Sequence, residues 1–335
     1  MFYARKIKVS VCIPVCGTEE FLPECLESVA LQAFGGLEVI VVDDNGSSKK
    51  DGGSVSAKKI LKDFCRKHKK EKIAAKFIRH EKNKGLVEAR RSALYESDGD
   101  FVMFLDSDDV LPPGAVKTLY ENAVKTGADI VQGRASVSRR GSASSQISSS
   151  ALRKFDNFYP GELKERQIFS GFLVESNHSG FLWGKIFTRE VCIKAFEKIP
   201  PVYCCLGEDF LTYFLISFFA KKYAGIETFV YNYFVNTGMS SGRKISSMEE
   251  WKRICSAASV FTVLLNIVQD GGIILSGQET EKLNESCRSY AANNLLQLEK
   301  SVESGLKSAA YDELCEWWGK NMIENIKKLM ENADA

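Results

Sequence analysis

The sequence predicts an α/β fold, with an open, mostly parallel β-sheet carrying helices on both faces and a helical C-terminal region. In the first third of the chain, short apolar runs rich in β-branched residues alternate with helical patterns. Most of these runs are nearly continuous in apolar residues, as expected of parallel strands that are buried on both faces. From about Ser246 the pattern is helical to the end, which predicts a separate helical region.

Four strands are predicted in the first third of the chain, at residues 9–13, 37–42, 76–78 and 101–105. Helices should connect them as crossovers. One follows a candidate cap at Thr18, and both show apolar stripes at helical spacing, which are Leu22, Leu26 and Val29 in the first and Leu86, Ala89, Ala93 and Leu94 in the second.

A third helix is predicted from Pro113 to about Thr126, followed by a short strand at Ile130 and Val131. Residues 136–150 are rich in serine and contain an Arg-Arg-Gly sequence, so a mobile loop without regular structure is predicted there. Its place after an acidic run makes it a candidate lid, and a tolerated surface insertion is the alternative.

Composition limits the classes of function. The 45 basic and 43 acidic residues nearly cancel, so there is no general case for nucleic-acid binding and any basic site must be local. The ten cysteines form no C-x-x-C pair and the three histidines lie far apart, which predicts reduced thiols and no structural zinc. No secretory signal or membrane-spanning run is recognised, and a cytoplasmic protein is therefore expected.

An acidic run, Asp106-Ser107-Asp108-Asp109, follows directly on the fourth predicted strand. Ligands of parallel α/β sheets bind at the carboxyl ends of the strands. Asp106 and Asp108 can share one Mg²⁺ or Mn²⁺ ion and leave positions open for phosphate oxygens, with Asp109 as a third ligand or a ribose contact. A polar turn is the alternative, but three aspartates in four residues repel one another without a cation, which favours the metal.

The second predicted strand ends in Asp43-Asp44-Asn45-Gly46-Ser47, at the same edge of the sheet. One of these carboxylates can accept a hydrogen bond from the N3–H of uracil, and a plain Asx turn is the alternative.

Four segments together resemble the family 2 glycosyltransferases in order and spacing, namely residues 9–14 (VSVCIP), 41–44 (VVDD), 83–90 (NKGLVEAR) and 104–109 (FLDSDD). The resemblance implies the GT-A fold, a Rossmann-like nucleotide-binding sheet merged with an acceptor-binding half. On this basis we expect a catalytic domain over residues 1–245, with a nucleotide-binding half (1–135) and an acceptor-binding half (136–245), before a helical region at 246–335.

The resemblance also implies roles for single residues on the donor side. Pro14 and Asp44 would line the uracil and ribose pocket, and Arg90 would reach the base or the phosphates. Ser107 would belong to the donor site with Asp106 and Asp108. Asp108, together with Asp106 or Asp109, would hold the metal.

Two later segments extend the resemblance, residues 181–187 (FLWGKIF) and 207–210 (GEDF). By the resemblance Asp209 is the general base. A sugar hydroxyl is a poor nucleophile and needs a positioned carboxylate to take its proton, and a single in-line displacement would invert the anomeric carbon. Acids in the first turn of a helix are the structural alternative for Glu208 and Asp209, and both interpretations can hold together.

The sequence departs from the family at two places. Cys16-Gly17 stands where the family has an aromatic residue and an asparagine, which weakens base stacking, so UDP is preferred but CDP- and GDP-linked donors stay open. In the segment expected to close over the diphosphate, Asn236 and Arg243 replace the family's usual histidine or arginine.

The sequence thus predicts an inverting, Mn²⁺- or Mg²⁺-dependent hexosyl- or N-acetylhexosaminyltransferase that acts in glycan or polysaccharide synthesis. Its partners would be a nucleotide-sugar and a glycan or lipid-linked saccharide acceptor, with no nucleic acid. The alternatives are a sugar nucleotidyltransferase, which lacks support because no glycine-rich loop follows the first strand, and a catalytically idle GT-A binding or assembly protein.

An apolar stripe runs through the last helical segment. It can pack on the catalytic domain, form a homodimer, or rest on the inner face of a membrane near a lipid-linked acceptor. Its members are Leu314, Trp317, Trp318, Met322 and Ile326.

Overall fold

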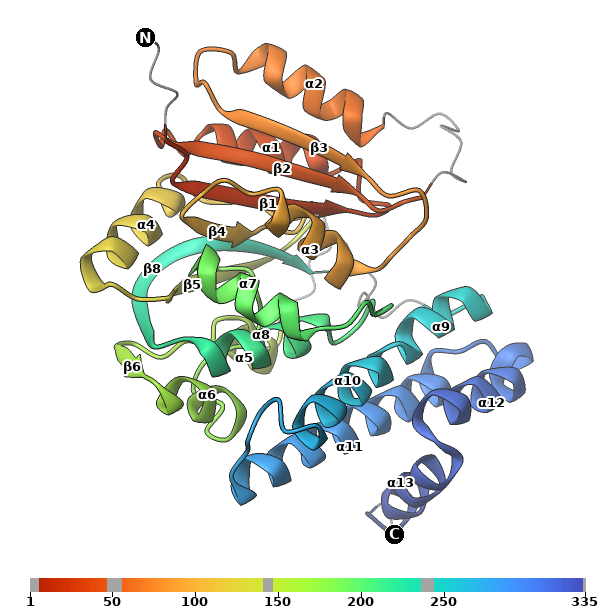
Figure 1. Ribbon diagram of the computed structural model, residues 1–335. Helices are drawn as coiled ribbons and strands as arrows, with labels where there is room; N and C mark the ends of the chain where they lie inside the picture. Colours follow the sequence, from red (N-terminus) through yellow and green to blue (C-terminus); the bar gives the residue numbers. More distant parts are fainter. Residues whose placement is uncertain (1–5, 47–55, 141–146, 236–243, 334–335) are drawn as a thin grey trace.

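The structure is a computed structural model that describes residues 6–46, 56–140, 147–235 and 244–333. Within these residues, eight strands form one sheet in the order β3-β2-β1-β4-β7-β5-β8-β6, with helices against both faces (Figure 1). The strands are β1 (Val9–Val15), β2 (Leu37–Asp43), β3 (Ala74–Arg79), β4 (Phe101–Phe104), β5 (Ile130–Arg139), β6 (Glu162–Lys164), β7 (Lys185–Thr188) and β8 (Lys222–Val235).

The first four strands are parallel, as predicted. Val9 of β1 pairs in register with Leu37 of β2 and with Phe101 of β4, so the carboxyl ends of these strands meet at one edge of the sheet. Beyond β4 the sheet becomes mixed, because β7 is antiparallel to both β4 and β5 while β8 is parallel to β5. The predicted α/β class is confirmed.

Alternate residues of the central strands enter two different cores, as the period of a strand requires. The helices before residue 236 are α1 (Leu22–Ala30), α2 (Ala57–Lys67), α3 (Leu86–Tyr95), α4 (Ala115–Thr126), α5 (Ser149–Phe155), α6 (Arg166–Leu173), α7 (Arg189–Lys198) and α8 (Glu208–Phe219). Val11 and Ile13 belong to the core under α1, α2 and α4, whereas Cys12 belongs to the core under α3, α7 and α8.

Four local predictions need correction. Thr18 does not cap α1, which begins after Phe21, because its hydroxyl lies 2.6 Å from that of Ser107. The third predicted helix starts at Ala115 and not at Pro113, since Gly114 before it is left-handed. Strand β5 continues to Arg139 and α5 begins at Ser149, so both ends of the predicted loop are regular, and residues 141–146 lie outside the described residues. Helix α2 was not predicted at all.

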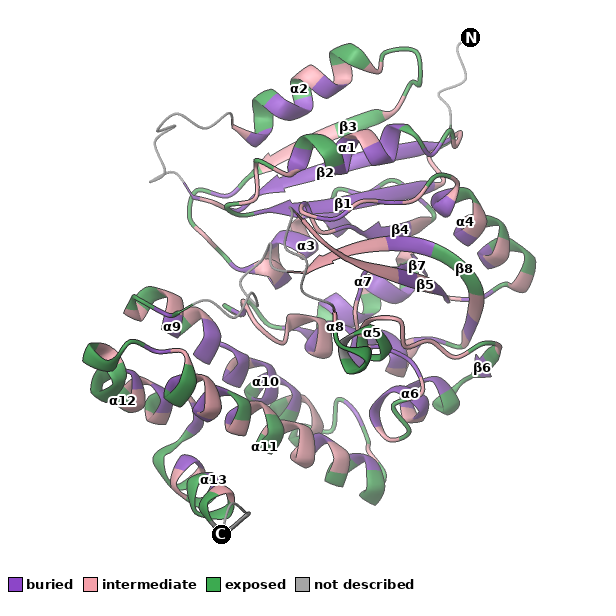
Figure 2. Ribbon diagram, turned by 180° about the vertical axis from the view of Figure 1, so that it is seen from behind, coloured by how far each residue is buried: buried purple, intermediate pink, exposed green. Residues whose placement is uncertain are grey.

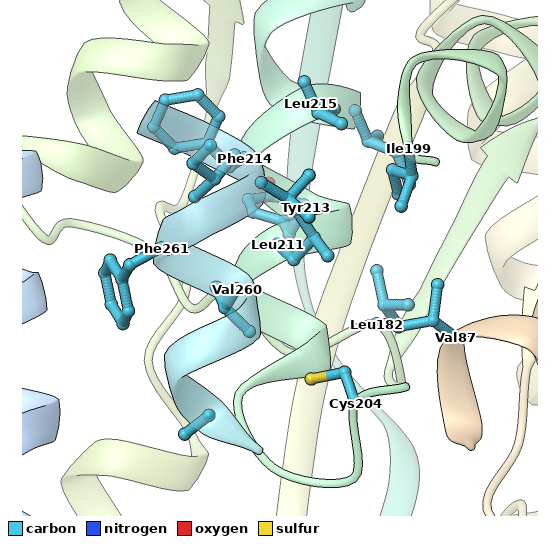
Figure 3. Packing of buried hydrophobic residues seen from close by; sticks show 14 of the residues in the cluster. Val87, Leu182, Ile199, Cys204, Leu211, Tyr213, Phe214, Leu215, Val260 and Phe261 are labelled. Atoms are coloured by element: carbon cyan, nitrogen blue, oxygen red, sulfur yellow. The ribbon is translucent and has the colours of Figure 1, made fainter. Parts of the chain in front are cut away.

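The C-terminal helices share a hydrophobic core with helices that cover the sheet. Phe261 of α10 contacts the rings of Phe210 in α8 and Tyr290 in α11, at centroid distances of 5.6 and 5.2 Å, and Figure 3 shows side chains of α8 and α10 in one cluster. The helices are α9 (Met248–Cys255), α10 (Ala257–Gln269), α11 (Gly277–Lys300), α12 (Lys307–Trp318) and α13 (Lys320–Ala333), with a short turn of 3-10 helix at Ser304–Leu306.

The predicted apolar stripe of the last helices packs inside the chain. Leu314, Trp318 and Ile326 are buried, and the indole of Trp318 donates to Asn294 of α11 over 2.9 Å. The stripe therefore offers little surface to a second subunit or a membrane, and the homodimer prediction loses the surface on which it rested.

One segment, Met248–Gln269, is long and apolar enough to cross a membrane by length and composition alone. Half of its most apolar window is buried inside the structure, and the segment is divided into α9 and α10 at Ser256. A core helix passes the same test, so the segment is weak evidence for a membrane span.

The shared core predicts that the C-terminal helices and the sheet unfold together. Replacing the buried Phe261 with alanine should lower the free energy of unfolding by about 3 to 5 kcal/mol, because it removes a large side chain from a packed site. Leu265, one turn further along α10 and 39% exposed, is the control, and Leu265→Ala should cost less than about 1 kcal/mol. Urea unfolding followed by circular dichroism measures both. Two separate transitions, of which only one moves in Phe261→Ala, would contradict the shared core.

Candidate active site

The loops that follow β1, β2 and β4 meet at the carboxyl edge of the sheet and bind one another. The backbone N–H of Gly17, after β1, donates to the side chain of Asn45, after β2, over 2.9 Å. The hydroxyls of Thr18 and Ser107 lie 2.6 Å apart and join the first loop to the acidic run. The sequence predicted this common edge, where Pro14 also lies, buried in β1 opposite Val42.

Asp44 anchors the turn that leads into α3. It is buried, and its carboxylate accepts hydrogen bonds from the backbone N–H groups of Lys84 and Gly85, both over 2.9 Å. Nδ1 of His80 lies 2.6 Å from Oδ1 of Asp44, and Nε2 of His80 lies 2.9 Å from the hydroxyl of Ser92. The neighbouring Asp43 makes the Asx turn, because its Oδ1 accepts from the N–H of Asn45. The two acids therefore have different roles.

The same turn touches residues 136–245, the predicted acceptor-binding half. Gly85 has a φ of +90°, and a Cβ at this position would lie 2.9 Å from the carbonyl oxygen of Cys204. The N–H of Leu86 donates to that oxygen over 3.2 Å. Only glycine fits here without displacing backbone, so the turn fixes how closely the two halves approach.

The acidic run is fixed to β8 by Asp109. This residue is fully buried, its Oδ2 accepts from the hydroxyl of Tyr231 and its Oδ1 accepts from the N–H of Phe234, both over 2.8 Å. Trp183, from the predicted tryptophan-lysine segment, stacks on Tyr231 at a centroid distance of 4.8 Å. Among the described residues, no three His, Cys, Asp or Glu side chains are grouped as metal ligands. β8 thus donates one hydrogen bond to each carboxylate oxygen of Asp109, and the metal role expected of Asp109 stays a prediction.

Asp106 and Asp108 suit a hard divalent cation. Both are half-buried, and their carboxylate oxygens are the ligand type that Mg²⁺ and Mn²⁺ prefer. Burial raises the pKa of Asp109 well above its usual range, and the charges of Asp106 and Asp108 raise it further. Burial and the same charges also raise the pKa of the Cys25 thiol. The edge thus carries negative charge that a cation would offset.

Arg140 lies beside the acidic run, a position that the sequence did not reveal. Its guanidinium donates to the carbonyl oxygen of Asp108 over 2.9 Å and pairs with Glu24. It also stands 4.1 Å from the ring centroid of Phe234 and 4.7 Å from that of Phe21. The available signal was the Arg139-Arg140 pair in the serine-rich stretch, but only the continuation of β5 carries Arg140 to this edge.

Arg90 joins the acidic run to the start of α8. Its side chain is buried, and its terminal nitrogens lie 2.6 Å from Asp209, 3.1 Å from Asp106 and 3.6 Å from Glu208. Although burial acts to lower it, the charges of these three carboxylates raise the pKa of Arg90 above its ordinary value. Both terminal nitrogens of Arg90 contact carboxylates, and its expected contact with the base or the phosphates stays a prediction.

Glu208 and Asp209 occupy the first turn of α8, where acids also suit the helix dipole. Burial raises the pKa of Asp209, and the charge of Arg90 opposes that rise. Burial and the charge of Asp209 raise the pKa of Glu208 to about 8. At neutral pH the pair therefore holds a proton on Glu208, while the contact with Arg90 favours the ionised form of Asp209.

Lys185 is a second cation on this side of the site. It is fully buried, and its Nζ donates to the carbonyl oxygen of Phe181 over 2.5 Å and to the hydroxyl of Ser179 over 3.1 Å. Burial lowers the pKa of Lys185 to about 7, and the charge of Asp209 opposes that fall.

Two further sequence features bear on the donor side. Cys16 is exposed, and its Sγ lies 3.2 Å from Nδ2 of Asn83. Asn236 and Arg243, expected near the diphosphate, lie outside the described residues.

Comparison with known proteins identifies related sequences and folds. The sequence profile described as "Glycosyl transferase family 2" matches residues 10–187. The glycosyltransferase GlyA of Streptococcus pneumoniae is 26% identical over 70% of this chain and 31% of its own length. A Campylobacter jejuni protein named GalNAc(5)-diNAcBac-PP-undecaprenol beta-1,3-glucosyltransferase is 29% identical over 55% of each chain. This chain therefore spans only part of the length of these relatives.

Among solved structures, residues 1–349 of Staphylococcus aureus TarS match 96% of this chain and 92% of the TarS chain, with a TM-score of 0.52 and 18% sequence identity. At this level of identity the match shows a shared fold. The C-terminal helices are included, because nearly the whole chain is covered.

The Arg90 contacts predict a large effect on stability. Arg90→Met leaves three carboxylates without their cation and should lower the free energy of unfolding by about 3 kcal/mol. This value is the lower end of the stability loss that is typical when a buried ion pair is broken, because the three carboxylates are 13% to 25% exposed. The loss should grow as the pH rises from 5 to 8. Without Arg90 the folded-state pKa values of Glu208 and Asp209 lie further above their unfolded values, so the folded protein binds more protons than the unfolded chain over this range.

Urea unfolding at both pH values measures this effect. The control is Asp209→Asn in the Arg90→Met background, which removes one unpaired charge and should restore part of the lost stability. An Arg90→Met protein as stable as the wild type at pH 8 would contradict the role given to Arg90.

Proposed function

Because the chain belongs to glycosyltransferase family 2, we propose that it transfers a sugar from a UDP-linked donor to an acceptor hydroxyl, with inversion of the anomeric carbon. The observation that carries this proposal is the position of Asp209, which shares Arg90 with Asp106 of the acidic run. A donor-side carboxylate and a candidate base thus lie on opposite sides of one guanidinium.

The donor would lie at the carboxyl edge of the sheet. Asp44 keeps acceptor capacity for a base or ribose, since each carboxylate oxygen can accept two hydrogen bonds and Oδ2 accepts one from Gly85. The fold relative TarS has been solved with UDP and with UDP-GlcNAc, which supports uridine as our choice of nucleotide. Pro14 and Ser107 would complete this side of the pocket.

Asp106 and Asp108 would hold a Mn²⁺ or Mg²⁺ ion, which when bound would offset the charge of the leaving diphosphate. Arg140 adds a fixed cation at the same edge, beside the carbonyl oxygen of Asp108. Together these groups would offset the negative charge that develops on the departing diphosphate.

Asp209 would take the proton of the acceptor hydroxyl. The contact of 2.6 Å with Arg90 fixes its carboxylate and favours the ionised form, while burial raises the pKa of Asp209. Arg90 is accordingly a positioning residue for the base. Glu208, protonated at neutral pH, can donate a hydrogen bond to the acceptor or to Asp209.

The acceptor would be a glycan or a lipid-linked saccharide, and the sugar a hexose or an N-acetylhexosamine. The name of the Campylobacter jejuni relative describes an undecaprenol-linked acceptor, which supports the lipid-linked class as a proposal for this chain. A cytoplasmic site of action is part of the same proposal.

Substitution of the two acids should separate donor binding from transfer. Asp209→Asn should reduce the transfer rate by about 100-fold or more, because the proton acceptor is lost, and should leave the affinity for UDP with Mn²⁺ within about twofold. Asp108→Ala should weaken that Mn²⁺-dependent affinity itself. Calorimetric titration with UDP and Mn²⁺ measures binding. A screen of nucleotide-sugars for Mn²⁺-dependent hydrolysis first identifies the donor. Mass spectrometry of acceptor mixtures incubated with that donor then measures transfer.

The exposed Asp312 in α12 supplies the matched control, and Asp312→Asn should change neither property. Full transfer by Asp209→Asn would exclude it as the base. Activity that survives exhaustive chelation would exclude the metal, and a wild-type protein that neither hydrolyses nor transfers from any tested nucleotide-sugar would favour an idle binding protein.

A further inference from the structure

A strong local charge lies on one helix of a nearly neutral chain. Residues 58–72 carry eight lysine or arginine side chains and two acidic ones, and so a net charge of +6. The whole chain has a net charge of +2, so the other 320 residues together carry −4. The segment comprises most of α2 and the turn that follows it. The basic residues are Lys58, Lys59, Lys62, Arg66, Lys67, Lys69, Lys70 and Lys72.

The fold places all eight of these side chains in solvent. Ile60, Leu61 and Phe64 form the apolar face of α2 and are buried against the sheet, whereas every one of the eight basic residues is exposed. Helix α2 lies beside β3 at the edge of the sheet, at the opposite end of the molecule from α12 and α13 (Figure 1), and Figure 2 shows exposed stretches along it. We call this exposed basic surface of residues 58–72 the α2 face.

Ion pairs within the chain neutralise only a small part of this face. Arg66 pairs with Asp63, and Lys67 lies 2.8 Å from Glu27 of α1. His68 lies 3.0 Å from the same Glu27. No other ion pair of the eight basic side chains is found within the described part of the chain. Most of the positive charge therefore points away from the protein.

The shape of the surface excludes a closed anion pocket. The hollow of about 510 Å³ between α1 and α2 has four acids and one lysine in its lining, besides three apolar residues. The charged residues are Glu19, Glu20, Glu27, Asp63 and Lys67. Anions are therefore repelled from the concave side of α2 and attracted to its outer side, which is a helix surface without walls.

The side-chain types select among anionic partners. Seven of the eight basic residues are lysines, whose ammonium groups are mobile point charges, and one is arginine, which makes bidentate contacts with phosphate. Proteins that bind single-stranded nucleic acid add exposed aromatic rings on which bases stack. The only aromatic carbon ring in residues 58–72 is Phe64, and it is buried. The α2 face thus fits a broad, diffuse layer of negative charge.

We infer that the α2 face binds the surface of a bilayer that contains anionic phospholipids. Clustered lysines are attracted to such a surface within about one Debye length. Because the apolar face of α2 is buried in the protein, the helix inserts no side chain into the acyl region, and the attachment is reversible and sensitive to salt. This contact replaces the apolar stripe of α12 and α13 as the membrane-facing surface, and it does not rest on the proposed sugar transfer.

Co-sedimentation with vesicles tests the inference on the full chain. At 50 mM salt the wild type should bind vesicles that contain 30% phosphatidylglycerol in phosphatidylcholine and should not bind pure phosphatidylcholine. Binding should fall at least about tenfold at 500 mM salt, because the contact is electrostatic. The triple variant Lys59→Glu, Lys62→Glu, Lys70→Glu should lose at least about tenfold in affinity for the anionic vesicles.

A matched triple variant separates the α2 face from overall charge. Lys125→Glu, Lys300→Glu and Lys328→Glu change the net charge equally at exposed positions of α4, α11 and α13, and this variant should bind far better than the α2 variant. Thermal unfolding of both variants confirms that they are folded. Equal losses in the two variants, or binding to neutral vesicles, would overturn the inference. Wild-type binding to a single-stranded oligonucleotide that exceeds binding to the anionic vesicles would overturn it in favour of a nucleic-acid surface.

Discussion

The active site depends on one buried guanidinium among three carboxylates. Arg90 comes from α3, Asp106 follows β4, and Glu208 and Asp209 begin α8, so a single side chain joins segments that are up to 119 residues apart in the sequence. Three acids so close together would repel one another or take up protons without this cation. Arg90 therefore places positive charge between the donor-side acid and the candidate base, which lie 3.1 and 2.6 Å from its terminal nitrogens.

Neighbouring contacts hold both sides of this arrangement in place. On the predicted donor side, both carboxylate oxygens of Asp109 accept hydrogen bonds from β8, one of them from the hydroxyl of Tyr231. Trp183 stacks on the ring of Tyr231. Near α8, Gly85 lets the turn before α3 approach the carbonyl of Cys204. The half-buried Asp106 and Asp108 are thus supported by the buried Asp109 and the ring of Tyr231. This division is the reason we propose Asp106 and Asp108, and not all three aspartates, as the metal ligands.

The sequence predicts the four parallel strands, because most of them are buried and are therefore continuous apolar runs, but it does not predict their order β3-β2-β1-β4 in the sheet. It predicts helices and strands less well where lysines or serines interrupt the apolar pattern. Helix α2 has only Ile60, Leu61 and Phe64 as strong apolar markers among lysines, and β5 continues through Ser136 and Ser138 because pairing with β8 supports it. The residue types of the site were predictable, but the direction of each carboxylate was not. Asp109 turns inward because of Tyr231, which lies 122 residues away.

The central claim is that Asp106 and Asp108 serve the donor while Arg90 keeps Asp209 on the acceptor side. A crystal structure of the protein with Mn²⁺ and UDP, with the metal located by its anomalous scattering, tests this claim most directly. The account predicts an anomalous peak on the carboxylates of Asp106 and Asp108, a diphosphate on the metal, and an Asp209 that still contacts Arg90. A peak on Asp109, or an Asp209 that ligates the metal, would contradict it.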